Sequence, residues 1–470
     1  MNILLTGASG YIGRRLKHRL LQEDGIRLRL FVKSGQTVTK SQNVEVFEGS
    51  TFEPESLERA LENIEVAYYL IHSMESKNFR ELDKISAKNF LEACIKQGVK
   101  RIVYLGGLGS KESASEHLIS RIETGELLSQ RPESIQTLWF RAGVIIGSGS
   151  ASFEIIRNLV EKLPFMIAPK WVHTLCQPSA ERDVIEYLAC AATITTDQNI
   201  IIDIGSEAKS YKELLTGYAK AANLKRFLLP VPFFSPKLSS YWLTLITPVP
   251  YSVASALVEG LKSEAVVKND NAKKYFPNIT PQDYDTAVKK ALEDIQNSQI
   301  ISRWSDASKD AWENDHTKIA EAVFTDRQSV ELGGISPQKV FETVSSVGGE
   351  TGWFGYEILW KIRGFVDKII GGYGLSRGRR DPKNLRVGDS VDFWKVVDVK
   401  QNERVLLFAQ MKLPGKAWLE WVIKDGRLHQ SAYFYPHGLF GRLYWYAMLP
   451  FHLFIFGGMA KNIIKKANLS

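Results

Sequence analysis

The sequence of 470 residues predicts two folded domains: a doubly wound parallel α/β sheet, followed by an α+β domain whose antiparallel sheet surrounds a long helix. Three observations support this fold class. An apolar strand runs into a glycine-rich loop at the start of the chain. Strand-like and helix-like segments then alternate over the first third. Aromatic residues gather in the last third, where the pattern becomes that of consecutive antiparallel strands.

The glycine-rich loop lies in residues 2–13, NILLTGASGYIG, where Gly7, Gly10 and Gly13 have the spacing G-x-x-G-x-x-G. We expect the first glycine to allow a tight turn and the second to let backbone approach a pyrophosphate. The third would let the following helix pack closely on the strand. The N-terminal N–H groups of that helix would face the phosphates, where the helix dipole favours negative charge. The segment therefore predicts a dinucleotide site that also includes Thr6, Tyr11, Ile12 and Arg14.

The end of the next strand, residues 27–32, indicates which dinucleotide is bound. An NAD-binding unit places an Asp or Glu there, on the ribose 2′-hydroxyl. This chain instead has Lys33, and Arg14 directly follows the last glycine of the loop. A cation at either position could pair with a 2′-phosphate. The sequence therefore favours NADP(H), with NAD(H) as the less favoured alternative.

The alternating segments give the order of the first sheet. Ligands of such sheets bind at the carboxyl ends of the strands, which directs attention to His72, Ser73, Gly106 and Arg141. Helices of this length between strands imply parallel pairing with right-handed crossovers. The predicted strands cover residues 28–32, 44–48, 66–71, 101–105 and 137–141, and the predicted helices cover residues 54–62, 79–97 and 116–130.

The motifs TGASGYIG, GVKRIVYLGGLG and RAGVIIGSGSASFE resemble the extended and atypical short-chain dehydrogenase/reductase superfamily. The similarity is greatest to its epimerase-like, NmrA-like and complex I accessory-subunit-like branch, and it covers residues 1–322, with a variable substrate-side region at about 205–300. It implies a Rossmann fold and a catalytic Tyr-x-x-x-Lys pair. His117 and Arg121 occupy the matching positions, so both residue types have changed. The resemblance also places Asp83 where a supporting Asn is usual.

Two interpretations of the changed pair stay open. His117 could act as the general acid or base, because an imidazole titrates near neutral pH. Arg121 would then hold ribose hydroxyls, and its charge would lower the pKa of the histidine. Alternatively, the site binds cofactor without turnover, which the substitution at each catalytic role favours.

The predicted function is that of an NAD(P)H-binding oxidoreductase-like protein acting on an apolar carbonyl or quinone-like molecule. A non-catalytic NADP(H)-binding or redox-sensing protein is one alternative. A nucleotide-sugar epimerase-like enzyme is another, because the resemblance includes that branch.

The second domain is predicted at residues 337–470, after a linker at 323–336. Its strands would cover residues 391–399, 404–411, 417–424 and 428–436, before a helix at 440–466. It resembles a bacterial domain of unknown function that is thought to be of helix-grip type. A sheet wrapped around a helix can enclose a cavity for a small apolar ligand. The candidate lining residues are Trp353, Trp394, Trp418, Trp421 and Trp445, which could equally fill a core.

The composition indicates which kinds of partner the chain can bind. The net charge of +8 comes from dispersed basic residues without the signature of a nucleic-acid module, so no nucleic-acid partner is expected. Eight scattered histidines and three distant cysteines predict no metal site. The cysteine usage and the absence of a secretory signal favour the cytoplasm. The uncharged stretch at 443–460 contains Pro450 and predicts a buried or surface-lying helix, with membrane-surface contact as the less favoured alternative.

Overall fold

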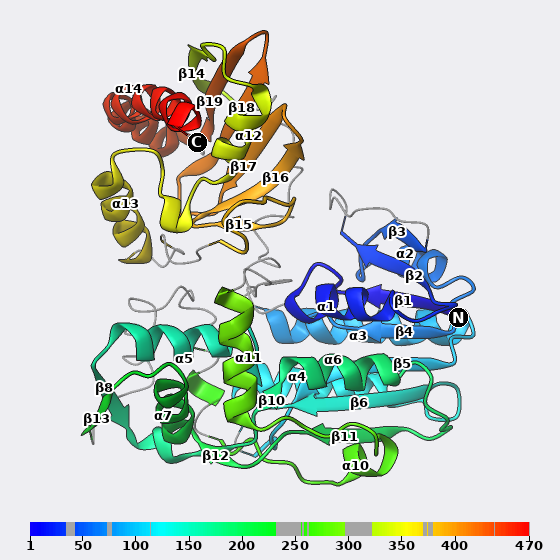
Figure 1. Cartoon of the computed structure of the whole chain (residues 1–470). Coiled ribbons are helices and arrows are strands. Elements are labelled where there is room, and N and C mark those ends of the chain that lie inside the picture. Colours follow the sequence, from blue (N-terminus) through cyan, green and yellow to red (C-terminus); the bar gives the residue numbers. More distant parts are fainter. Residues whose placement is uncertain are drawn as a thin grey trace. The chain divides into compact units, whose positions relative to one another are not determined.

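The structure is a computed structural model that divides into two compact units, each described by itself (Figure 1). The first comprises Met1–Thr247 and Tyr251–Ala307, and the second comprises Pro248–Pro250 and Ser308–Ser470. The structure describes residues 1–33, 43–72, 78–112, 114–231, 255, 258–260, 263–296, 322–369, 374, 379–436 and 438–469.

The first unit contains a parallel sheet of seven strands in the order β11-β6-β5-β4-β1-β2-β3. The order reverses between β1 and β4, which pair through Ile3 and Val66. Such a reversal is the switch point where doubly wound sheets bind ligands. The predicted doubly wound fold is confirmed. The strands are β1 (Asn2–Thr6), β2 (Arg27–Val32), β3 (Val44–Glu48), β4 (Val66–Tyr69), β5 (Arg101–Gly107), β6 (Gln136–Ala142) and β11 (Ile200–Ile204).

Helices cover both faces of this sheet, because alternate residues of each strand are apolar on opposite faces. Ile3 and Leu5 of β1 pack in one core, whereas Leu4 between them packs in the other. The first core includes α1 (Tyr11–Leu20) and α6 (Glu181–Cys190). The second core includes α2 (Pro54–Ala60), α3 (Phe79–Lys96) and α4 (Glu116–Leu128).

A smaller core lies beside this sheet within the first unit. Phe153, Tyr218 and Tyr284 are buried in it, and the Phe153 and Tyr218 rings are 5.7 Å apart. Its helices are α5 (Ala151–Lys162), α7 (Tyr211–Ala221) and α11 (Tyr284–Gln296). The short elements here are β7 (Ile145–Ile146), β8 (Phe165–Pro169), β9 (Leu175–Cys176), β10 (Ser179–Ala180), β12 (Lys209–Ser210), β13 (Phe227–Val231) and α10 (Asn271–Tyr275).

The second unit contains a six-stranded antiparallel sheet in the order β14-β19-β18-β17-β16-β15, as predicted for its fold class. Its helices are α12 (Pro337–Ser345), α13 (Glu357–Ile369) and α14 (Gly438–Leu469), with α14 following the last strand. The strands are β14 (Phe324–Glu331), β15 (Ser390–Val391), β16 (Trp394–Lys400), β17 (Arg404–Ala409), β18 (Gly415–Lys424) and β19 (Arg427–Pro436).

The expected linker at residues 323–336 is wrong, because most of it is strand β14. All eight residues of β14 pair with β19, from Phe324 opposite Phe434 to Glu331 opposite Arg427. Its sequence, FTDRQSVE, is largely polar, and alternate side chains are only half-buried. A strand of this kind lacks the apolar alternation that identifies strands in a sequence.

The tryptophans of the second unit do not line one interior. Trp353, Trp394 and Trp421 lie in the main core, under α12 and α14. Trp418 packs on the opposite face of the sheet, with Leu406 and Phe408. Of the five candidates, Trp418 therefore lies outside the core that contains Trp421, because residues 418 and 421 of one strand point to opposite faces.

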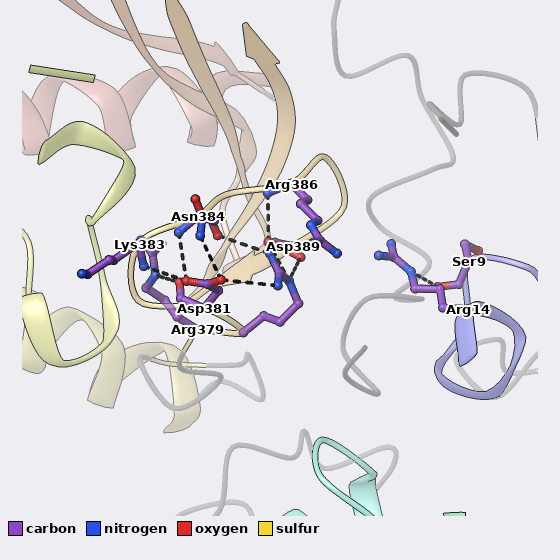
Figure 2. A network of polar contacts seen from close by, with 9 residues as sticks. Ser9, Arg14, Arg379, Asp381, Lys383, Asn384, Arg386 and Asp389 are labelled. Atoms are coloured by element: carbon purple, nitrogen blue, oxygen red, sulfur yellow. Dashed lines mark hydrogen bonds and ion pairs between the residues drawn. The ribbon is translucent and has the colours of Figure 1, made fainter. Parts of the chain in front are cut away.

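A buried ion pair fixes the loop before β15, as Figure 2 shows. Asp389 accepts hydrogen bonds from Nε and Nη2 of Arg380, at 2.9 and 3.0 Å, and from the backbone N–H of Arg386. Arg380 and Asp389 are both buried. Asp381 accepts the backbone N–H groups of Lys383 and Asn384 in the same loop. The loop is thus anchored by buried charge at Arg380 and Asp389.

Within the described parts of the chain, no single helix is both long enough and apolar enough to cross a membrane. Two segments of α14, Phe440–His452 and Ile455–Leu469, are long and apolar enough for a membrane span only when they are taken together. They are bent by 43° relative to each other, close to Pro450. Proline kinks a helix because it lacks the N–H and clashes with the preceding turn.

Candidate functional site

The glycine loop has the backbone that its sequence predicts. Gly7 has a φ of +65°, and a Cβ there would lie less than 3.0 Å from the carbonyl oxygen of Leu70. A Cβ on Gly13 would lie equally close to the backbone of Gly7. The N–H of Gly10 donates to Gly7 O at 2.9 Å and closes the turn. The tight turn at Gly7 and the close helix packing at Gly13 are confirmed.

The N-terminus of α1 has the features of an anion site. Gly10 is its N-cap residue, and the first hydrogen bond of the helix runs from Arg14 N to Gly10 O. The N–H groups of Ile12 and Gly13 precede that bond, so they can bind a ligand. The first turn contains no acidic residue that would repel a phosphate. The helix dipole adds to this preference for negative charge.

Two side chains fix the loop to neighbouring elements. Thr6 Oγ1 donates to Tyr68 O at 2.8 Å and accepts from Leu70 N at 3.1 Å, so it joins β1 to the end of β4. The Tyr11 hydroxyl donates to Ser148 O at 3.3 Å. Burial raises the pKa of Tyr11 above its ordinary value. The hydroxyls of Thr6 and Tyr11 therefore tie the glycine loop to the end of β4 and to the backbone at Ser148.

Arg15, directly after the glycine loop, forms a buried ion pair that the sequence prediction missed. Its Nη1 is 2.8 Å from Glu181 Oε2, its Nη2 donates to Ser148 O at 2.6 Å, and its guanidinium lies 4.7 Å from the Tyr11 ring centre. Arg15 and Glu181 are both buried. The sequence offered no signal that separates Arg15 from Arg14, because a helix can expose two consecutive side chains.

The two cations predicted to distinguish the dinucleotides lie at the same end of the sheet. Lys33 is exposed directly after β2, whose Phe31 is opposite Thr6 of β1. The Arg14 guanidinium folds back on the loop, and its Nε donates to Ser9 O at 2.9 Å (Figure 2). Ser73 lies outside the described residues.

His72 forms the most specific contact at the carboxyl end of the strands. Its Nδ1 lies 2.7 Å from Oδ2 of Asp83, a buried carboxylate of α3. Ser120 of α4 donates to the same oxygen at 2.9 Å. Burial lowers the pKa of His72, although the hydrogen bond with Asp83 acts in the opposite direction. The sequence predicted only a cofactor-binding role for His72. The structure shows in addition that its ring contacts Asp83, whose carboxylate also accepts from Ser120.

His117 lies next to this pair. Its ring stacks on Phe79 with 4.1 Å between centroids and meets the His72 ring edge-on at 6.0 Å. Ser115 caps α4 by accepting from Leu118 N, which places His117 in the first turn. Burial, followed by the nearby His72, lowers the pKa of His117. Among the described residues, Nδ1 of His117 has no hydrogen-bond partner.

Arg121 is held by contacts with β5. Its Nη2 donates to Leu105 O at 3.2 Å, and its own carbonyl accepts from the Tyr104 hydroxyl at 2.9 Å. Its charge is one of the smaller influences that lower the pKa of His117, as the sequence predicted. Gly106 lies in β5, where a Cβ would come within 3.0 Å of Trp139 Nε1. Packing therefore explains this glycine without a ligand.

Arg141 has a protein partner that the sequence did not indicate. Its Nε and Nη2 lie 2.6 and 2.9 Å from the two carboxylate oxygens of Asp203, which is buried in β11. The two residues are directly opposite in the parallel pairing of β6 and β11. Asp203 also accepts the N–H of Lys268 at 2.8 Å. This bidentate ion pair anchors the guanidinium at the strand end.

Part of each unit matches a known protein family. Residues 7–129 match the family described as NAD(P)H-binding. Residues 318–459 match a family described as a protein of unknown function, DUF2867. None of the curated protein sequences compared with the chain matches it. The second match begins before β14, in agreement with the structure.

Solved structures share the fold of the first unit. Triphenylmethane reductase of Citrobacter sp. is 20% identical, with a TM-score of 0.52. The match covers 62% of this chain and the whole of the reductase. A nucleoside-diphosphate-sugar epimerase of Staphylococcus aureus is 16% identical, with a TM-score of 0.51 over 62% of this chain and all of its own. UDP-glucose 4-epimerase of Thermotoga maritima is 16% identical, with a TM-score of 0.50 over 64% of this chain and all of its own. The chain therefore contains a Rossmann-fold unit that matches an NAD(P)H-binding family over residues 7–129, and a second region, residues 318–459, that matches the DUF2867 family.

Proposed function

We propose that the first unit is an NADP(H)-dependent oxidoreductase in which His72, oriented by Asp83, transfers the proton. The observation that carries the proposal is the 2.7 Å contact between His72 Nδ1 and Asp83 Oδ2, at the edge of the sheet where this fold binds ligands. A carboxylate at Nδ1 favours the tautomer with its proton there, which leaves Nε2 as the basic nitrogen. A histidine oriented in this way is suited to general acid–base catalysis.

The loop residues fit the dinucleotide. The turn at Gly7 and the absence of a side chain at Gly10 let a pyrophosphate approach the N-terminus of α1. The N–H groups of Ile12 and Gly13 would bind its oxygens. Lys33 would pair with a ribose 2′-phosphate, because it is exposed at the end of β2 where NAD-binding proteins have a carboxylate. These features support NADP(H) over NAD(H).

The chemistry follows from the position of the imidazole. A bound nicotinamide would exchange a hydride with a carbonyl or hydroxyl carbon of the substrate. In the reducing direction, Nε2 of protonated His72 would give its proton to the carbonyl oxygen. In the oxidising direction, the neutral ring would take the hydroxyl proton. Because burial lowers the pKa of His72, the neutral ring is the resting form at neutral pH, which favours the role of base.

His117 is better suited to bind substrate than to move the proton. Its Nδ1 lacks a partner among the described residues, so its tautomer is not fixed as that of His72 is. Its ring and that of Phe79 are stacked 7° from parallel and present aromatic surface beside His72. Flat apolar surface of this kind supports the proposal of an apolar carbonyl or quinone-like substrate.

The test compares two glutamine variants of the full chain. Oxidation of NADPH is followed with a naphthoquinone, an aromatic aldehyde and an aliphatic ketone, and NADPH binding is measured by fluorescence. We expect His72→Gln to lower turnover by about a hundredfold or more and to leave NADPH affinity unchanged. His117→Gln should mainly raise KM.

Unchanged turnover in His72→Gln would refute the assignment of the proton to His72. If the wild-type chain binds NADPH but oxidises it with none of the three substrates, the non-catalytic alternative replaces the proposal.

A further inference from the structure

Helix α13 of the second unit is apolar on the side that faces away from the core. Its inner side is apolar too: Trp360 is buried, and its ring lies 6.3 Å from that of Phe456 on α14. Single exposed apolar residues are common, but a contiguous stripe of large ones marks an interaction site. The outer side chains follow the helical repeat and are between 43 and 73% exposed: Ile358, Ile362, Phe365, Val366 and Ile369.

The first half of α14 carries a second group of exposed apolar side chains. The two helices lie on the same side of the second sheet (Figure 1). Arg363 of α13 is within hydrogen-bonding reach of the Tyr444 hydroxyl of α14. We call the combined surface of α13 and this half of α14 the apolar face. The part from α14 consists of Phe440, Leu443, Tyr446 and Phe451, which are all exposed.

The charges beside the apolar face are positive. The first half of α14 contains Arg442, its second half contains three lysines, and neither half contains an Asp or Glu. On α13, Lys361 is exposed. The acidic residues of α13 are engaged by backbone: Asp367 accepts from Lys412 N at 2.7 Å, and Glu357 accepts from Trp353 N at 2.7 Å. Two exposed cations, Lys361 and Arg442, therefore lie on the helical segments that form the apolar face, with Glu357 as the exposed acidic residue of these segments.

We propose that the apolar face docks the second unit on the surface of an anionic lipid bilayer. Interfacial helices bury aromatic and aliphatic side chains at the level of the headgroups and keep cations beside anionic lipids. The apolar face has both properties, and Tyr446 supplies an amphipathic ring of the kind enriched at membrane interfaces. The bend of 43° within α14 and the buried side chains of its second half favour lying on the bilayer over crossing it. This docking goes beyond the proposed redox activity and does not depend on it.

The experiment measures co-sedimentation of the full chain with vesicles. One set is phosphatidylcholine alone, and the other is a roughly three-to-one mixture of phosphatidylcholine and phosphatidylglycerol. We expect the wild-type chain to bind the mixed vesicles at least tenfold more strongly. Raising NaCl from about 0.05 M to about 0.5 M should weaken that binding, because salt screens the attraction of the cations.

The variants separate apolar insertion from charge. The triple variant Ile358→Gln, Ile362→Gln, Phe365→Gln should lower binding to both kinds of vesicle at least tenfold. Lys361→Gln with Arg442→Gln should remove most of the preference for the anionic mixture. The matched control is Phe165→Gln with Phe227→Gln, because these stacked rings form another exposed apolar pair, in the first unit. The control should bind vesicles as the wild type does.

Two results would overturn the proposal. In the first, the triple variant, with an unchanged melting temperature, binds vesicles as the wild type does. In the second, the wild type ignores both kinds of vesicle and is a dimer by light scattering that the triple variant converts to a monomer. The apolar face would then be a contact between two copies of the chain.

Discussion

The Nδ1 of His72 lies 2.7 Å from a carboxylate oxygen of Asp83, although the two residues come from different layers of the first unit. His72 follows β4 of the sheet, whereas Asp83 lies in α3. Ser120 on α4 also contacts that oxygen. The orientation of the imidazole therefore depends on how two helices pack against the end of one strand.

Replacing Asp83 by Asn tests this orientation with little change of volume. The amide cannot stabilise an imidazolium, so the hydrogen bond that raises the pKa of His72 is weakened and that pKa falls further. We expect turnover to fall about a hundredfold. The acid limb of the pH profile for alcohol oxidation should move to lower pH. Asp367→Asn, at a buried carboxylate of the second unit, is the control and should change neither the rate nor the profile.

Acidification should destabilise the fold through its buried histidines. Burial lowers the pKa of His72 and His117 below their ordinary value of 6.5, so the unfolded chain binds more protons than the folded one just below that pH. The free energy of unfolding should therefore fall as the pH drops below about 6.5. Urea titrations of the wild type and His72→Gln check this, and an equally steep fall in the variant would contradict the contribution of His72.

The preference for NADP(H) is expected to depend on Lys33. Loss of a charge-assisted contact with the 2′-phosphate should weaken NADP(H) binding about tenfold in Lys33→Ala and leave NAD(H) binding unchanged. Calorimetric titration with both dinucleotides measures the effect. Lys100→Ala is the matched control, because Lys100 is exposed before β5, at the other end of a strand. Equal loss for both cofactors would argue against the role of Lys33.

A methyl group at Gly13 should disrupt the loop. The new Cβ would lie less than 3.0 Å from backbone atoms of Gly7 and Ala8, which cannot move without opening the turn. We expect Gly13→Ala to lower the free energy of unfolding by about 1–3 kcal/mol and to abolish nucleotide binding. Gly457→Ala in α14, where the nearest atom is 3.9 Å from the new Cβ, should be neutral or slightly stabilising. Denaturant titration compares the two variants.

The buried pair Arg380–Asp389 should contribute strongly to the stability of the second unit. Asp389→Asn removes the carboxylate that pairs with Nε and Nη2 of Arg380 and leaves this buried guanidinium with the more distant Asp381, 3.9 Å from its Nη1. The expected loss is about 3–5 kcal/mol. Glu331→Gln breaks the exposed pair with Arg427 and should cost less than about 1 kcal/mol. Thermal unfolding of both variants, followed by tryptophan fluorescence, distinguishes the two effects.

The sequence was most informative where local pattern decides structure. The strands of the first sheet and the turn at Gly7 follow from hydrophobic period and glycine spacing, which act over a few residues. Contacts between distant segments could not be predicted. Asp203 is 62 residues from Arg141, and nothing in the sequence shows that β11 pairs with β6. His72 and Asp83 were both singled out, but only the packing of α3 brings them together.

The place of β14 beside β19 has a consequence for how the second unit can be separated from the chain. A fragment that began at residue 337, where the sequence places the domain start, would leave one side of β19 without its eight paired residues. Unpaired N–H and C=O groups along a strand are a template for sheet-to-sheet aggregation. In the intact chain, β14 pairs with β19 and is itself the edge strand of the sheet. Its charged residues, Asp326, Arg327 and Glu331, oppose the addition of a further strand at that edge. A fragment that keeps residues 322–336 retains this protection.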